Sequence, residues 1–382
     1  MTGFMVISVI IAIVSIVIFG TDFFVNKILN LKRVHIGRWE SREKWRKAVE
    51  KRAVWWLKYT PTVRQTDNSR YVLIDILKGK YRNQTIQSWQ KAGLLVGLKE
   101  CTSDWAKKEV EKWKKQIFDE NGMWKKNIDK VDFSMLGYAA LLVEEDTNKI
   151  RPAMENIINM LEKHLCPDGL ISYSQGKESV IRFVDTLGMV CPFLALYGRI
   201  YQEKKYLNLA VEQIRKFRKI GLYTGSQLPC HAVNIENQKP LGIYGWGRGT
   251  VWYIIALVDT FRELPEGCVK REVKQWICEA AEEYLTYQKE DGSFYTILQG
   301  AGQYDSSVTA GMAYFYRSCA EIFENQEYKK IAERCITRIM KVTMKNGAID
   351  QCQGDTHGIG IFSQVFDIMP FVQGLILRAM EE

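Results

Sequence analysis

One carboxylate, Asp185, stands near the start of an apolar segment of helical length that reads IRFVDTLGMVCPFLALYG from Ile181 to Gly198. An Asp at the beginning of a helix can act as its N-cap, because the side chain accepts hydrogen bonds from the free N–H groups of the first turn. A carboxyl group at the mouth of a buried helix can also serve as a catalytic acid or base. The segment alone leaves both functions open.

Other polar and aromatic side chains gather in segments that precede apolar, helix-forming stretches. They are Asp132, Arg182, His231, Tyr244, Trp246, Arg248, Trp252, Tyr295, Tyr304, Asp305 and His357. This mixture suits a carbohydrate site, because sugar faces stack on Trp and Tyr while Arg pairs with a uronate carboxylate through two hydrogen bonds. The chain has no phosphate loop, no Ser-His-Asp order and no metal-ligand spacing that would favour another chemistry.

Each of these residues also has a structural interpretation. Trp246 and Trp252 could be core aromatics, and His231 could be a hydrogen-bonded loop residue. Asp132 and Asp305 could be helix caps. Their meaning depends on whether the fold brings them together.

The body of the chain is predicted to be helical. Apolar residues recur at three- and four-residue intervals from Ser41 to Tyr59, and few later stretches alternate with a period of two. Further helices are expected at Thr85–Leu98, Ser103–Phe118, Asp132–Glu145, Arg151–His164, Asp185–Tyr201, Lys205–Ile220, Gly249–Arg262, Lys270–Lys289, Ser306–Phe323, Gln326–Val342 and Asp367–Met380.

A repeat organises these helices. A charge-rich helix ends in a short turn, and a polar loop then leads into a more apolar helix; four of the turns are Asn121-Gly122, Asp168-Gly169, Asp291-Gly292 and Asn346-Gly347. Such helical hairpins bury a shared core by stacking. Six of them can close into an (α/α) toroid that gathers the loops before the inner helices at one mouth, and an open solenoid is the alternative.

The N-terminal segment predicts a membrane anchor. Phe4 to Gly20 carries no charge, and 17 helical residues span about 25 Å, near the lower limit for a bilayer. A cleavable signal peptide is the alternative, although no Lys or Arg precedes the apolar run. Basic residues follow it, so the body is expected in the cytoplasm. We expect an anchor over residues 1–22, a basic linker over 23–40 and one six-hairpin domain over 41–382.

Charge and cysteine content exclude some classes of protein. The 382 residues carry 53 Lys and Arg against 44 Asp and Glu, and most of this excess lies between residues 21 and 60. This distribution argues against a nucleic-acid groove and for a basic region beside a membrane. The nine cysteines are odd in number and never spaced C-x-x-C, which argues against a disulfide framework or a metal cluster and suits a reducing compartment.

Two motifs carry a family resemblance. VDTLGMVCPFLA and YGWGRGTVWYIIALVDTFRELPE resemble segments of the unsaturated glucuronyl and rhamnogalacturonyl hydrolases, which are six-hairpin toroids. The later segments DGSFYTILQ and PFVQGLIL agree with the same family, so that the resemblance covers about residues 40 to 382. It implies a glycoside hydrolase that removes a Δ4,5-unsaturated uronic acid from oligosaccharides made by polysaccharide lyases.

The resemblance also implies roles for individual residues. Asp185 matches the general acid and base, and Asp132 matches an assisting acid on the preceding inner helix. The implied substrate-binding residues are Arg182, His231, Tyr244, Trp246, Arg248 and Trp252. The reaction is a hydration of the C4=C5 enol ether that uses no metal and no organic cofactor. Its acid must keep a proton near neutral pH, which burial and a second nearby carboxylate favour.

Two other functions remain open. One is a different sugar enzyme on the same toroid, such as an epimerase or an inverting hydrolase. The other is a non-catalytic, membrane-tethered protein that binds glycans. The expected partners in the main hypothesis are an oligosaccharide with an unsaturated uronate and the membrane, without nucleic acid.

Overall fold

Charge-rich helices alternate along the chain with apolar ones in the computed structural model, which describes residues 2–59, 61, 63, 72–79, 87–101, 103–300 and 302–380. The charge-rich outer helices are α2 (Arg42–Lys58), α5 (Asp104–Ile117), α7 (Arg151–His164), α9 (Lys204–Gly221), α11 (Cys268–Leu285) and α13 (Gln326–Lys341). The apolar inner helices are α4 (Ser88–Leu98), α6 (Phe133–Val143), α8 (Val184–Ile200), α10 (Gly247–Glu263), α12 (Ser306–Ile322) and α14 (Pro370–Ala379). The predicted all-α, six-hairpin architecture is confirmed.

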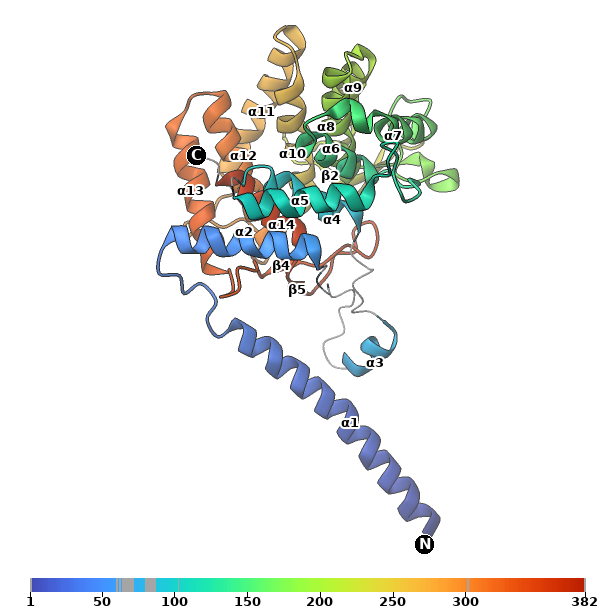
Figure 1. Cartoon of the computed structure of the whole chain (residues 1–382), viewed down its shortest axis with the longest axis vertical. Helices are drawn as coiled ribbons and strands as arrows, with labels where there is room; N and C mark the ends of the chain where they lie inside the picture. Colours follow the sequence, from blue (N-terminus) through green and yellow to red (C-terminus); the bar gives the residue numbers. More distant parts are fainter. Residues whose placement is uncertain are drawn as a thin grey trace.

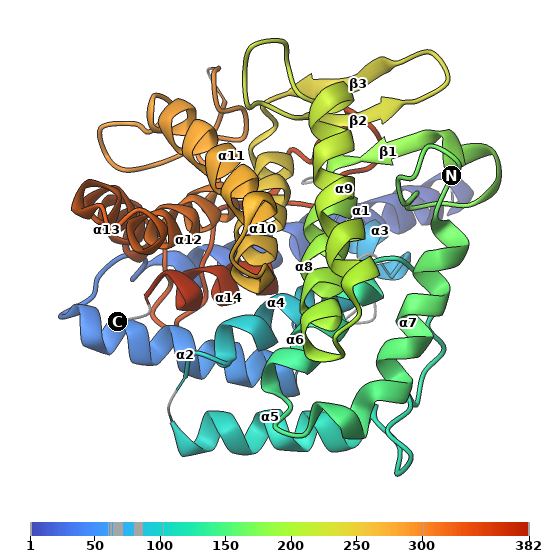
Figure 2. The same ribbon diagram turned by 90° about the horizontal axis from the view of Figure 1, so that it is seen from above.

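The inner helices form a ring of contacts. Each packs on the next from α4 through α6, α8, α10 and α12 to α14, and α14 in turn packs on α4. Glycines permit this last contact, since a Cβ atom added at Gly97 would lie 2.4 Å from the Cα atom of Gly374. Figures 1 and 2 show α2, α5, α7 and α13 on the outside of the body.

A buried ion pair ties the C-terminal parts of α10 and α14 to the middle of α12. Arg378 of α14 donates from its two Nη atoms to Asp259 of α10, at 3.1 and 2.6 Å. The hydroxyl group of Tyr314, on α12, donates to the same carboxylate. Asp259 is completely buried, and this network fixes one end of the ring.

Short strands lie among the loops at the other end. β1 (Ile181–Phe183), β2 (Cys230–Asn234) and β3 (Lys239–Tyr244) form an antiparallel sheet, and β4 (Cys352–Gln353) pairs with β5 (Phe366–Asp367). These strands were not predicted, because β1, β4 and β5 are too short to show a period of two and burial does not alternate along β2 and β3. The predicted start of the last helix at Asp367 is wrong: Asp367 ends β5, and α14 begins at Pro370, since the residue before a proline disfavours helical geometry.

The N-terminal helix α1 (Thr2–Arg33) projects from the body (Figure 1). Its apolar part is exposed, and in the described residues it alone is long and apolar enough to cross a membrane, a property that signal sequences share. The helix continues into the predicted linker as far as Arg33, and this last residue docks on the body. There Arg33 donates from Nε and Nη2 to the buried carboxylate of Asp350, the latter at 3.0 Å.

The chain just after α1 also rests on the body. The N–H group of Gly37 and the indole N–H of Trp39 both donate to the carbonyl oxygen of Thr343, at 2.9 and 3.3 Å. The base of α1 is therefore held in place by several hydrogen bonds.

Candidate active site

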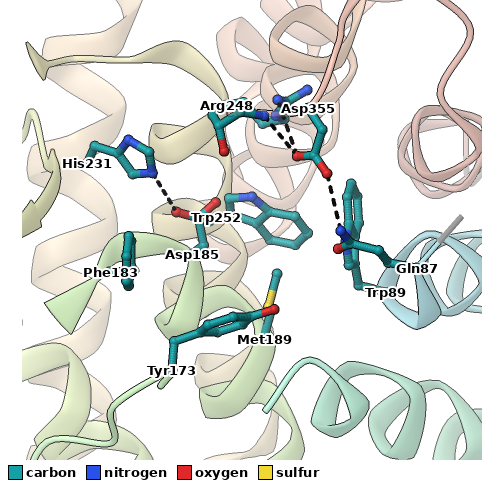
Figure 3. A pocket seen from close by; sticks show the side chains of 11 residues that line it. Gln87, Trp89, Tyr173, Phe183, Asp185, Met189, His231, Arg248, Trp252 and Asp355 are labelled. Atoms are coloured by element: carbon teal, nitrogen blue, oxygen red, sulfur yellow. Dashed lines mark hydrogen bonds and ion pairs between the residues drawn. The ribbon is translucent and has the colours of Figure 1, made fainter. Parts of the chain in front are cut away.

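A cavity of about 190 Å³ opens at the end of the ring where the inner helices begin (Figure 3). It is lined by Gln87, Trp89, Tyr173, Phe183, Asp185, Met189, His231, Arg248, Trp252, Asp355 and Thr356. These residues come from the N-terminal parts of α4, α8 and α10 and the residue before α4, from β1 and β2, and from the loops after α7 and β4. The volume is below the range of about 300 to 1,000 Å³ that is typical of drug-sized ligands, and it suits one terminal sugar ring.

Asp185 is the second residue of α8, where Phe183 holds the N-cap position and makes no side-chain cap. Its carboxylate is therefore not the N-cap, and its Oδ2 atom has no hydrogen-bond partner among the described residues. Burial raises the pKa of Asp185 to about 7; the positive charge of Arg248 opposes this shift, and the negative charge of Asp355 adds to it. Asp185 thus keeps a proton on a large fraction of molecules near neutral pH.

His231 lies beside this carboxyl group, with its Nε2 atom 3.7 Å from Oδ2 of Asp185. The N–H group of Gly360 donates to Nδ1 of His231 at 3.3 Å. Burial and the charge of Arg248 lower the pKa of His231 to about 4, so the ring is neutral. Because Nδ1 accepts, the ring proton lies on Nε2, which faces Asp185 as a hydrogen-bond donor.

Arg248 supplies the positive charge of the cavity. Its Nη1 and Nη2 atoms donate to the carbonyl oxygens of Gln353 and Gly354, both at 2.6 Å. The carboxylate of Asp355 is 4.0 Å from Nη2 and accepts from Nε2 of Gln87 at 3.4 Å. Arg248 therefore has backbone partners and only a distant carboxylate, which leaves its charge available to an anionic ligand.

Aromatic side chains form the walls. The rings of Trp89 and Trp252 meet edge to face with centroids 5.5 Å apart. Tyr173 and Phe183 pack in the same manner on the other side of Asp185 in Figure 3, at 6.2 Å. An acid, a cation and aromatic faces thus surround one small space, as recognition of a charged sugar requires.

Asp132 does not line this cavity. It stands at the N-cap position of α6 without making a side-chain cap, and its Oδ1 atom has no partner in the part of the chain that the structure describes. Burial raises the pKa of Asp132 to about 6, against the charge of Lys130. Asp132, Asp185 and Asp355 all act electrostatically on Tyr173, whose pKa is raised chiefly by burial. The second carboxylate that acts on Asp185 is Asp355, whereas we expected Asp132.

Three other predicted residues lie outside the lining. Trp246 is buried behind His231, with ring centroids 4.6 Å apart, and it donates to Oε1 of Gln353 at 3.2 Å. Tyr244 packs on Tyr223. Arg182 donates to both carboxylate oxygens of Asp168, at 3.1 and 3.0 Å.

Arg182 is directed away from the site because it lies in β1, where neighbouring side chains point to opposite faces. Phe183 takes the cavity side. A helix through this segment would instead have placed Arg182 and Asp185 on one face, since they are three residues apart.

Several lining residues were not predicted: Gln87, Trp89, Tyr173, Phe183, Met189, Asp355 and Thr356. A signal existed for Asp355, which lies two residues before His357 in a Gly-containing loop that leads to the last inner helix. Asp305, in contrast, caps α12, because it accepts from the N–H group of Ser307 at 2.8 Å.

The fold and the site define a toroidal, sugar-active enzyme with a buried carboxyl group of raised pKa in a pocket at one end of the ring. The chain matches the model of Glycosyl Hydrolase Family 88 over residues 62–381. It belongs to this family, and the protein is a glycosyl hydrolase.

Solved structures share the fold. A possible member of glycoside hydrolase family 105 from Klebsiella pneumoniae has a TM-score of 0.73 at 19% identity, with 89% of this chain and 93% of that chain covered. The unsaturated glucuronyl hydrolase responsible for the degradation of glycosaminoglycan, from Bacillus sp. GL1, has a TM-score of 0.62 at 18% identity, with 87% and 93% covered. A search of curated proteins gives no match.

Proposed function

We propose that this glycosyl hydrolase removes a Δ4,5-unsaturated uronic acid from the non-reducing end of oligosaccharides made by polysaccharide lyases. The observation that carries the proposal is the carboxyl group of Asp185, whose pKa is raised to about 7 inside a pocket for one sugar ring that also contains the guanidinium group of Arg248. Membership of the family and the named activity of its structural relatives support the same substrate class.

The uronate is bound through its carboxylate and its ring. The guanidinium group of Arg248 attracts the carboxylate, while Trp89 and Trp252 offer apolar surface to the sugar. The carboxylate of Asp355 lies 4.0 Å from Nη2. It repels an anion on that side of Arg248, so the uronate carboxylate approaches the guanidinium group from the other side.

The reaction is a hydration. The carboxyl group of Asp185 gives its proton to C4 of the C4=C5 enol ether, and the electron-deficient C5 that results takes up water. The Asp185 carboxylate accepts the proton that this water loses, which restores the starting acid. The hemiketal at C5 then opens its ring, and the rest of the oligosaccharide is released from C1. The Nε2–H group of His231 can hold Asp185 or the water in position.

The test is the Asp185→Asn variant of the full-length chain in detergent. Loss of the ultraviolet absorbance of the conjugated uronate is followed with a panel of lyase products. Asp104→Asn, an exposed carboxylate at the start of α5, is the matched control. We expect turnover in the wild type and in the control and its loss in Asp185→Asn. No turnover by the wild type on any product, with binding retained, would instead favour the non-catalytic glycan-binding function.

We further propose that α1 anchors the enzyme in a membrane with its body on the cytoplasmic side. The exposed apolar surface of α1 and the basic residues Lys27, Lys32 and Arg33 near its C-terminal end support this orientation. Protease added to intact cells should leave the body undigested, and its digestion would overturn the orientation.

A further inference from the structure

A second cavity, of about 310 Å³, lies where the end of α1 meets α2 and the loops of the body. Leu29, Lys32 and Arg33 line it from α1, and Arg52 and Trp56 line it from α2. We propose that this cavity binds the phosphate headgroup of an anionic membrane lipid, an inference that rests on the proposed membrane anchoring by α1 and is independent of the catalytic site.

Arg52 is the first observation. Its Nε atom donates to the carbonyl oxygen of Asn346 at 2.9 Å, and its guanidinium carbon lies 5.8 Å from the centre of the Trp56 ring. No carboxylate pairs with it among the described residues, and burial lowers its pKa. A partly buried guanidinium group without an anionic partner is unfavourable, and a bound phosphate would supply that partner.

The other charges leave the cavity positive. Arg33 is neutralised by Asp350, and Asp367, which also lines the cavity, lies 3.9 Å from its Nη2 atom. Lys32 has no ion-pair partner in the part of the chain that the structure describes. Lys32, Arg33 and Arg52 thus carry three positive charges against the two negative charges of Asp350 and Asp367, and one positive charge of the cavity is left unbalanced.

The position along α1 indicates what kind of phosphate reaches the site. Apart from Asp22, the helix carries no charged residue from Phe4 to Phe24, a length of about 31 Å that is comparable to the hydrocarbon core of a bilayer. Leu29, at the edge of the cavity, lies about 8 Å further along the axis, which is the depth of the headgroup layer. A lipid phosphate is thus delivered to the cavity by the same membrane that holds α1.

Helix α3 (Val72–Leu77) provides a second sign that this side of the body faces lipid. It packs on α1 and lies on the side of the body from which α1 leaves (Figure 1). Its side chains Ile74, Ile76 and Leu77 are exposed. Exposed apolar residues beside a membrane helix fit contact with the bilayer surface.

The proposal is tested with the full-length chain in nanodiscs of phosphatidylcholine alone or of phosphatidylcholine with phosphatidylglycerol. Native mass spectrometry measures the lipid that stays bound after release from the disc. We expect the wild type to retain one phosphatidylglycerol per chain in preference to phosphatidylcholine. Arg52→Gln and Lys32→Gln should each reduce this retention by about tenfold, the loss expected for one charge-assisted hydrogen bond.

Arg271→Gln, an exposed arginine on α11, is the matched control and should retain the lipid like the wild type. The melting temperature checks folding, and Lys32→Gln removes no ion pair that the described residues form. Equal retention by the two cavity variants and the wild type would overturn the proposal. Inorganic phosphate is added to the protein in nanodiscs of phosphatidylcholine alone. If it raises the melting temperature as much as phosphatidylglycerol does, the ligand is free phosphate and not a lipid. Uronide turnover is measured in parallel and should be the same in the two cavity variants as in the wild type. Failure of the lipid-site proposal is thus distinguished from failure of the proposed hydrolase activity.

Discussion

Each end of the inner-helix ring buries a carboxylate, and the two carboxylates differ in their hydrogen-bond partners. At the end where the helices finish, Asp259 accepts hydrogen bonds from Arg378 and Tyr314. At the end where they begin, Asp185 has a neutral histidine at 3.7 Å and an Oδ2 atom without a hydrogen bond among the described residues. The first carboxylate thus has a cation as its partner, and burial raises the pKa of the second to about 7.

The helix dipoles alone would favour a charged carboxylate at Asp185 more than at Asp259. A carboxylate is stabilised near a helix N-terminus, where Asp185 lies, and destabilised near a C-terminus, where Asp259 lies. This effect is worth only about 0.3 to 1 kcal/mol at exposed sites, whereas breaking a buried ion pair costs about 3 to 5 kcal/mol. The raised pKa of Asp185 therefore follows from its burial and not from its position on the helix.

The largest effect should come from Asp185→Asn. Asn has no acidic proton to give, so kcat should fall by about 100- to 10,000-fold, the usual contribution of a general acid. The melting temperature should be unchanged or higher. Circular dichroism checks that the variant is folded. If activity is lost only because the protein unfolds, Asp185 stabilises the fold, and this end of the ring does not differ from the end that holds Asp259.

Arg378→Met tests the other end. It leaves Asp259 as a buried charge without a cation, and the free energy of unfolding should fall by about 3 to 5 kcal/mol in urea titrations. The kcat of the molecules that remain folded should hold. Combining it with Asp259→Leu should recover part of the stability, because no uncompensated charge then remains; no recovery would show that the contact acts through packing instead.

The free energy of unfolding should fall as the pH rises, because the buried carboxyl group of Asp185 then ionises. Its pKa is about 7 in the folded protein and ordinarily 3.8, so the folded state binds the proton more tightly. The resulting stabilisation is complete below pH 3.8 and is lost as the pH rises through 7. Between pH 5 and pH 8 the wild type should lose up to about 3 kcal/mol relative to Asp185→Asn. Thermal unfolding at both pH values measures this difference, and equal losses in the two proteins would contradict the raised pKa.

The smallest effect is expected from Asp355→Asn. Removing this negative charge should lower the pKa of Asp185, because Asp355 raises it. The fall of kcat/KM at alkaline pH should then begin at a lower pH, by less than about one unit. Asp104→Asn should leave the profile unchanged. A shift towards higher pH would mean that Asp355 acts on Asp185 in some other way.

The sequence predicted the helices and the central acid because both leave local signals. Apolar spacing identifies the hairpins, and Asp185 is recognised as one charge in an apolar run. Asp355 and Trp89 reach the cavity from the loop after β4 and from α4, far away in the chain. No local pattern connects them to Asp185, so only the closing contact between α14 and α4 explains their presence.

Single residues were misjudged where one short strand replaced a helical turn. Arg182 and Asp185 would share a helical face, but β1 ends at Phe183 and sends Arg182 to Asp168. Three residues are too few for a period of two to be recognised. Trp246 was predicted to touch substrate, and it instead supports the ring of His231 from behind.

The docking of Arg33 on Asp350 decides where the gene can be shortened for a soluble enzyme. A fragment that starts at residue 41, the predicted domain boundary, loses Arg33 and leaves a fully buried carboxylate without its cation. Asp350 is followed directly by the segment whose carbonyl oxygens, at Gln353 and Gly354, hold Arg248. A fragment that begins at Lys27 lacks the long apolar part of α1 but keeps the ion pair between Arg33 and Asp350. It is therefore the better starting point for crystallisation.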